Sequence, residues 1–109
     1  MDNDTLKALT ISRDVSIRDA IATIDRSRRQ IALVVDTDGK LVATVTDGDV
    51  RRGILRGDDL DGPVAQVMHV SPTVVREGEN DSEVRRLIRE RKLQHVPVID
   101  AAGRLMDLA

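Results

Sequence analysis

Residues 31–56, IALVVDTDGKLVATVTDGDVRRGILR, decide the fold of this chain. Ile31–Val35 is a continuous apolar run of strand length, the pattern of a strand covered on both faces. Residues 36–39 end in Asp-Gly, a strong short-range signal of a hairpin, and Leu41–Thr46 is the returning strand. Residues 47–49 then open a helix whose first-turn acids suit the helix dipole. We expect a ligand at this strand-to-helix junction.

Composition limits the class of protein. The 109 residues, 40% hydrophobic and 33% charged, are typical of one compact globular unit. The net charge of −2 and the complete absence of aromatic residues argue against a nucleic-acid binder. Without cysteine there is no disulfide, thiol nucleophile or thiolate metal site. The sequence has no bilayer-spanning apolar run and no basic signal-peptide start, so we expect a cytoplasmic protein that does not bind membranes.

The second half of the chain repeats the first at an offset of 64 residues. Asp36 matches Asp100 and Gly39 matches Gly103 at this offset. Residues 16–19 resemble a capping box ahead of an amphipathic helix that reaches about residue 28, and residues 80–83 are a second cap of the same kind. A duplicated unit of this length predicts two pseudo-symmetric halves that pack face to face.

The remaining segments are shorter. Residues 6–11 are predicted as an opening strand or turn, and residues 73–75 take the place of residues 9–11 in the second half. Residues 63–68 are predicted as a short helix begun by proline. Counterparts of Thr46 and Asp49 would lie beyond Ala109. We expect either the leading part of a longer protein or a second half that has lost its junction.

Residues 31–50 and residues 95–109, HVPVIDAAGRLMDLA, resemble the hairpins of the tandem CBS domain, named for cystathionine β-synthase. The resemblance covers essentially the whole chain and implies an α/β module of two βαββα halves around a pseudo-twofold axis. Motif 1 would occupy residues 1–62, and motif 2, incomplete at its C-terminus, residues 63–109.

A second resemblance concerns the attached enzyme. Residues 46–53, TDGDVRRG, and residues 60–68, LDGPVAQVM, look like the CBS pair placed ahead of sugar-nucleotide transferase domains. They look somewhat like the pair found with sugar-phosphate isomerase domains. The resemblance therefore implies a C-terminal catalytic domain that this module tunes. It also implies a homodimer, for which the helix faces around Ile54-Leu55 and Leu87-Ile88 are candidates.

The family resemblance further implies a small-molecule nucleotide as a regulatory ligand in the cleft between the motifs, with no other cofactor. AMP, ADP, ATP and a cytidine or guanosine sugar nucleotide are the alternatives for this ligand. Asp49 carries over as the ribose-binding carboxylate and Thr46 as its preceding hydroxyl. The helix N-terminus, with Arg51 or Arg52, would face a phosphate. The remaining candidates are backbone groups for the base and one residue for the cleft wall: Thr10, Ile11, Ser12, Gln30, Ile31, Ala32 and His95.

Other readings stay open. Asp49 is also consistent with an ordinary acidic residue in the first turn of a helix, without a ligand. Arg51 and Arg52 are also consistent with the solvent-exposed face of that helix. Residues 36–39 do not fit a calcium loop, two histidines alone make no metal site, and no nucleophile motif is present, so we expect no catalysis from this segment. The alternative function is a structural dimerisation module without a ligand. Asp107, a charge where the family keeps a glycine, favours that alternative, whereas Ala43 is a smaller departure.

Overall fold

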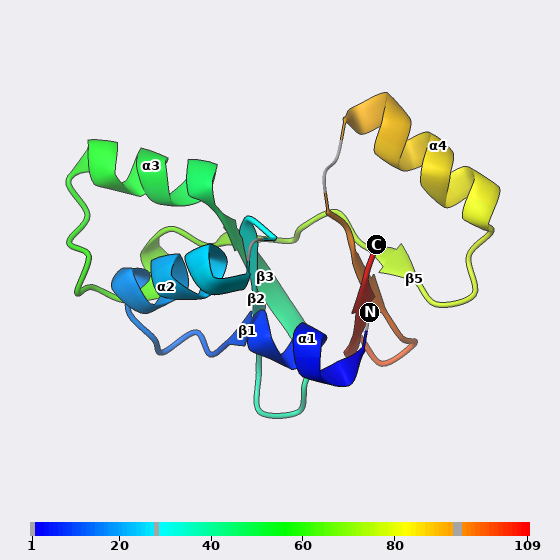
Figure 1. Cartoon of the computed structure of the whole chain (residues 1–109), viewed down its shortest axis with the longest axis horizontal. Helices are drawn as coiled ribbons and strands as arrows, with labels where there is room; N and C mark the ends of the chain where they lie inside the picture. Colours follow the sequence, from blue (N-terminus) through cyan, green and yellow to red (C-terminus); the bar gives the residue numbers. More distant parts are fainter. Residues whose placement is uncertain (1, 28, 93–94) are drawn as a thin grey trace.

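The computed structural model describes residues 2–27, 29–92 and 95–109. Its strands form a four-stranded sheet of order β1-β2-β3-β4 and a three-stranded sheet of order β5-β6-β7 (Figure 1). In chain order the elements are α1 (Asn3–Ala8), β1 (Thr10–Ile11), α2 (Ile17–Ser27), β2 (Ile31–Val35), β3 (Leu41–Thr46), α3 (Asp47–Arg56), the 3-10 helix η1 (Val64–Gln66), β4 (His69–Val70), β5 (Val75–Arg76), α4 (Asp81–Arg91), β6 (Pro97–Ile99) and β7 (Leu105–Leu108).

The four-stranded sheet combines β1, β2 and β3 of the first half with β4 of the second half, and it carries a helical layer. β1 runs parallel to β2, while β2 with β3 and β3 with β4 are antiparallel. α2 and α3 lie beside each other on this sheet (Figure 1). The capping box predicted ahead of α2 is present, since the Asp19 backbone N–H donates to Ser16 Oγ at 3.1 Å and the Ser16 N–H to Asp19 Oδ2 at 3.4 Å. Apolar residues of α2 such as Ile17 and Ala20 are fully buried against the sheet.

The opening segment differs from the prediction. Residues 6–11 were expected to form a strand or turn, but α1 includes Leu6 and only Thr10–Ile11 is a strand. Asp2 caps α1, accepting the Thr5 backbone N–H at 2.7 Å. Leu6 and Leu9, three residues apart, both bury their side chains in a second core cluster, as one helical turn allows and strand alternation does not.

The predicted repeat is confirmed in the strand register. Ile11 pairs with Val34 in the first sheet, and Val75 pairs with Val98 in the second, each residue shifted by 64. Both hairpins carry the same irregularity, between Val34 and Val35 and again between Val98 and Ile99. The tandem α/β architecture is thus built from one unit used twice.

The two hairpins meet across a local twofold axis. The Leu41 N–H donates to the Gly103 carbonyl, and the Leu105 N–H donates to the Gly39 carbonyl, both at 3.0 Å. These bonds are reciprocal because Leu41 and Gly39 correspond to Leu105 and Gly103 in the repeat. Beside them, a core cluster joins the halves, made of Leu6, Leu9, Ile31, Leu33 and Leu108.

The second half differs from the first in the burial of its helix. The predicted apolar stripe of α4, formed by Val84, Leu87 and Ile88, is only half-buried. α4 stands away from both sheets (Figure 1). In the first half α3 lies beside α2, whereas the described residues contain no helix after β7 that would cover α4 in the same way.

Candidate functional site

The junction between β3 and α3 is fixed by a capping box. Thr46 is the N-cap in extended conformation, and its Oγ1 accepts the Asp49 backbone N–H at 3.3 Å. Asp49 Oδ2 in turn accepts the Thr46 backbone N–H at 2.9 Å and the Thr46 hydroxyl at 3.1 Å. Threonine at the N-cap with a carboxylate three residues later is the sequence pattern that forms this arrangement. The carboxylate is therefore held rigidly at the end of the buried strand, with only 12% of the side chain exposed.

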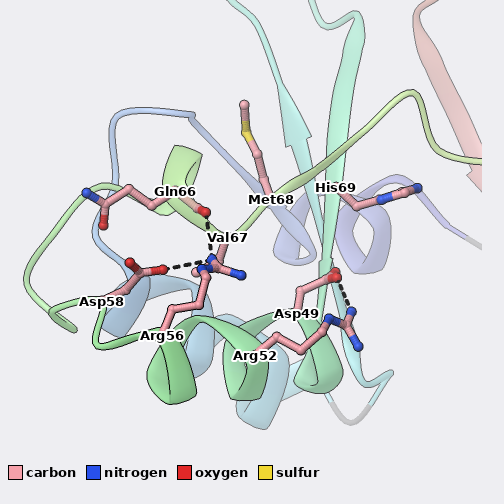
Figure 2. A pocket seen from close by; sticks show the side chains of 8 residues that line it. All are labelled: Asp49, Arg52, Arg56, Asp58, Gln66, Val67, Met68 and His69. Atoms are coloured by element: carbon pink, nitrogen blue, oxygen red, sulfur yellow. Dashed lines mark hydrogen bonds and ion pairs between the residues drawn. The ribbon is translucent and has the colours of Figure 1, made fainter.

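Arg52 occupies the other oxygen of that carboxylate. Its Nη2 lies 2.6 Å from Asp49 Oδ1, one helical turn away, while 64% of the arginine side chain is exposed (Figure 2). The predicted phosphate partner thus forms an ion pair within the site. Arg51 is exposed and lines neither of the clefts beside this junction.

One cleft, of about 490 Å³, lies between α3 and the segment that leads into β4 (Figure 2). α3 approaches this segment closely because Gly53 has no side chain where Val67 packs. Arg56 ties the two walls together, donating to Asp58 Oδ2 at 2.8 Å and to the Gln66 carbonyl at 3.1 Å. The lining residues are Asp49, Arg52, Arg56, Asp58, Gln66, Val67, Met68 and His69.

A second cleft, of about 380 Å³, brings the two halves of the chain together at the start of α3. The first half supplies Gln30, Ile31 and residues 46–48, and the second half supplies Lys92 and His95. Burial and, to a smaller extent, the positive charge of Arg29 lower the pKa of His95 below its usual value. At neutral pH the cleft therefore presents the ammonium of Lys92 and the carboxylate of Asp47 beside a neutral imidazole.

The structure separates the remaining predicted residues from Asp49. Thr10, Ile11 and Ser12 line a different cleft, of about 370 Å³, next to the end of β2. The sheet explains the separation. β1 and β2 are parallel, so both end at the edge where Thr10, Ile11 and Ser12 lie. Thr46 pairs with Ile31 at the start of β2, which places the capping box at the opposite edge. Ala32 is fully buried.

Several residues at the clefts were not among the predicted ones, and Met68, His69 and Lys92 are three of them. Met68 directly precedes β4 and His69 is its first residue. The residue pattern had related residues 60–68, and so Met68, to the family without relating them to a ligand. Lys92 caps α4 in the left-handed conformation, with φ of 53°. Lys92 shares the second cleft with Thr46 because of the way the two halves of the chain pack together. No short sequence pattern predicts this packing.

Within the described ranges, no group of three or more histidine, aspartate or glutamate side chains is arranged to hold a metal ion. The same ranges contain no helix long and apolar enough to cross a lipid bilayer.

Comparison with known families places this chain in one of them. The CBS domain profile matches residues 4–56 and residues 64–108, so the chain belongs to the CBS domain family. Among curated relatives, arabinose 5-phosphate isomerase GutQ of Escherichia coli K12 is 27% identical over 95 residues, which are 87% of this chain and 30% of the isomerase. Inosine-5'-monophosphate dehydrogenase of Mycobacterium tuberculosis is 38% identical over 76 residues, 69% of this chain and 14% of the enzyme. The chain therefore spans less than a third of these relatives.

Solved structures agree with this assignment. CBSX2, a CBS-pair protein from Arabidopsis thaliana, was crystallised in complex with AMP and superimposes with a TM-score of 0.77 at 27% identity, over 91% of this chain and 78% of that one. A CBS domain protein from Pyrobaculum aerophilum, also complexed with AMP, gives a TM-score of 0.80 at 21% identity, over 96% and 85% of the two chains. The second similarity concerns the fold alone.

Proposed function

We propose that this CBS pair is a regulatory module that binds an adenine nucleotide, with the ribose hydroxyls on Asp49. The observation that carries the proposal is the carboxylate itself, which is preoriented by the capping box and lines the first cleft, while its capping partner Thr46 lines the second. A carboxylate accepts hydrogen bonds from both hydroxyls of a ribose, and such charge-assisted bonds are roughly twice as strong as neutral ones. The AMP complex of the structurally similar CBSX2 supports the choice of ligand.

The two clefts suggest how the rest of the nucleotide lies. The phosphate would extend into the second cleft, where the N-terminus of α3 at Gly48 and the ammonium of Lys92 favour an anion, while the carboxylate of Asp47 opposes it. The base would extend into the first cleft, beside the thioether of Met68 and the ring of His69. Thr10, Ile11 and Ser12 take no part in this arrangement, because they line a separate cleft at the other end of β2.

Isothermal titration with AMP, ADP and ATP tests the proposal directly. Wild type is expected to bind at least one of the three, and Asp49→Ala to bind it at least tenfold more weakly, since a hydrogen bond to a charged group contributes about 1.5–3 kcal/mol. Asp61→Ala is the matched control, because it removes the same charge from an exposed ion pair with Arg18. A wild-type protein that binds none of the nucleotides, or equal affinity in Asp49→Ala, would contradict the proposal.

We also propose that the module tunes an attached catalytic domain, for which the sequence favours a sugar nucleotidyltransferase. The halves would divide after residue 62, within the turn that leads to η1. The curated relatives named above are sugar-phosphate and nucleotide-metabolising enzymes, which supports an attached enzyme acting on a small phosphorylated substrate. Regulation requires that the nucleotide bind two arrangements of the module with different affinity. Enzyme assays of the full-length protein with and without the nucleotide test this step.

A ligand-free dimerisation module is the second candidate, favoured by one observation. Leu55 and Ile54 on α3 are 81% and 51% exposed, and the apolar stripe of α4 is only half-buried. Pairing of two copies over these faces would remove this apolar surface from water. Sedimentation equilibrium distinguishes the cases: a dimer that Leu55→Asp dissociates supports this interface, and a monomer at all concentrations contradicts it.

A further inference from the structure

Arg52 lies where the proposed ligand needs to bind. Asp49 Oδ2 is already engaged by the backbone N–H and the hydroxyl of Thr46. Oδ1 is therefore the carboxylate oxygen with capacity for a ligand, and the Arg52 guanidinium lies 2.6 Å from it. Oδ1 has two acceptor sites and the guanidinium occupies one of them, so a ribose that places both of its hydroxyls on Oδ1 has to displace this ion pair.

Gly48 provides the space for this arrangement. A Cβ atom built on Gly48 would lie 3.3 Å from Arg52 Nη1 and 3.7 Å from Nη2. The guanidinium therefore lies against bare backbone in the first turn of α3. This is also where the helix N-terminus offers its unpaired N–H groups to an anion, so the arginine covers the ribose position and borders the phosphate position.

The Asp49–Arg52 pair is weak enough to exchange. The arginine side chain is 64% exposed, and exposed ion pairs at this helical spacing contribute little to stability because water and salt screen them. The carboxylate, by contrast, is largely buried and held by Thr46. In an exchange the arginine would therefore leave while the carboxylate stays in place.

We propose that Arg52 is a built-in competitor of the nucleotide, which occupies Asp49 Oδ1 in the empty site and is displaced when the ribose binds. The inference rests on the function proposed above and goes beyond it, because it assigns Arg52 the opposite effect from a phosphate-binding arginine. Removal of Arg52 would strengthen ribose binding, whereas removal of a ligand-binding arginine would weaken it.

Titration with adenosine tests the inference, because this probe carries the ribose and no phosphate charge. Arg52→Ala is expected to bind adenosine about two- to fivefold more tightly than wild type, the range that the energy of an exposed ion pair allows. Arg52→Gln should change affinity in the same direction, which excludes an effect of shortening the side chain. Arg51→Ala is the matched control, since it removes the same charge from the neighbouring exposed position and should leave the affinity unchanged.

The outcomes separate the inference from the function on which it rests. Equal or weaker adenosine binding by Arg52→Ala, with wild type still binding, would overturn the inference and leave the proposed function intact. Equal strengthening by Arg51→Ala would also overturn it, because the cause would then be net charge. If neither wild type nor any variant binds adenosine or AMP, the proposed function fails and the inference fails with it. Circular dichroism melts of each variant confirm that it is folded.

Discussion

Alanine at Gly53 tests the close approach that forms the wall of the first cleft. In the middle of an exposed helix, glycine to alanine is expected to stabilise by about 1 kcal/mol, through helix propensity alone. In this structure a Cβ atom on Gly53 would collide with a methyl group of Val67 and lie 3.1 Å from Asp58 Oδ2. Val67 is 6% exposed and belongs to the core cluster, so it cannot move aside without disturbing that core.

The sign of the effect follows from the two magnitudes. Overpacking of a well-packed site costs about 1–3 kcal/mol, which exceeds the gain from propensity over most of that range. We expect Gly53→Ala to lower the free energy of unfolding by about 1 kcal/mol, the difference between the middle of that range of costs and the gain. The midpoint of thermal unfolding should fall by several degrees, since 1 kcal/mol corresponds to about 4–8 °C in a domain of this size.

The assay is urea denaturation of wild type and four variants, namely Gly53→Ala, Gly48→Ala, Val67→Ala and the double variant of Gly53 and Val67. Gly48→Ala in the same helix is the matched control, because its Cβ atom would meet the exposed end of Arg52 at 3.3 Å and Thr46 Oγ1 at an ordinary contact distance of 3.7 Å, and should cost little. In the Val67→Ala background, Gly53→Ala should cost at least 1 kcal/mol less than in wild type, since the colliding methyl group is gone. A Gly53→Ala protein as stable as wild type would refute the close packing of α3 on this segment.

Three further predictions concern the repeat, a histidine and the helix cap. Asp36→Ala and Asp100→Ala should destabilise the protein by a similar amount, about 1–2 kcal/mol, because each carboxylate accepts two backbone N–H groups at 2.9 Å in the same hairpin geometry. If urea denaturation showed no loss of stability for one of the two variants, the result would contradict the repeat. Because the pKa of His95 is lowered by folding, the unfolded chain binds the imidazole proton more readily than the folded one. The contribution of His95 to the free energy of unfolding should therefore be fully present above pH 6.5, the usual pKa of histidine, and should be lost as the pH falls below it. The same pH series on His95→Gln should show a smaller loss of stability. Thr46→Ala should cost about 1 kcal/mol in the same assay by removing the α3 cap, and no loss would argue against the capping box.

Much of the fold was predictable because its signals are local. The apolar run Ile31–Val35, the Asp-Gly turn and the two caps each specify their element through neighbouring residues. The repeat then predicted the second hairpin from the first. α1 was not predicted because its helix is one and a half turns long and its two buried leucines, Leu6 and Leu9, are explained only by the interface between the halves.

The site was predictable only in its centre. Thr46 and Asp49 could be related to a ligand because the motif that places them is contiguous. The cleft walls depend on which residues of the second half lie opposite, which is why Lys92 and His69 were not predicted. Arg52 follows Asp49 by three residues, a spacing that allows an ion pair between them on a helix. A contact between Arg52 and a phosphate is equally consistent with this spacing, so only the position of the guanidinium in the structure shows the ion pair.

The most direct test of the central claim is to map AMP binding onto the chain by amide chemical-shift perturbation. Binding at Asp49 predicts the largest shifts in the α3 N-terminus, residues 46–49, with further shifts at His69 and His95 on the cleft walls. Asp49→Asn should weaken the titration without moving these shifts elsewhere. Shifts centred on Thr10, Ile11 and Ser12, at the opposite end of β2, or no shifts at all, would contradict the account.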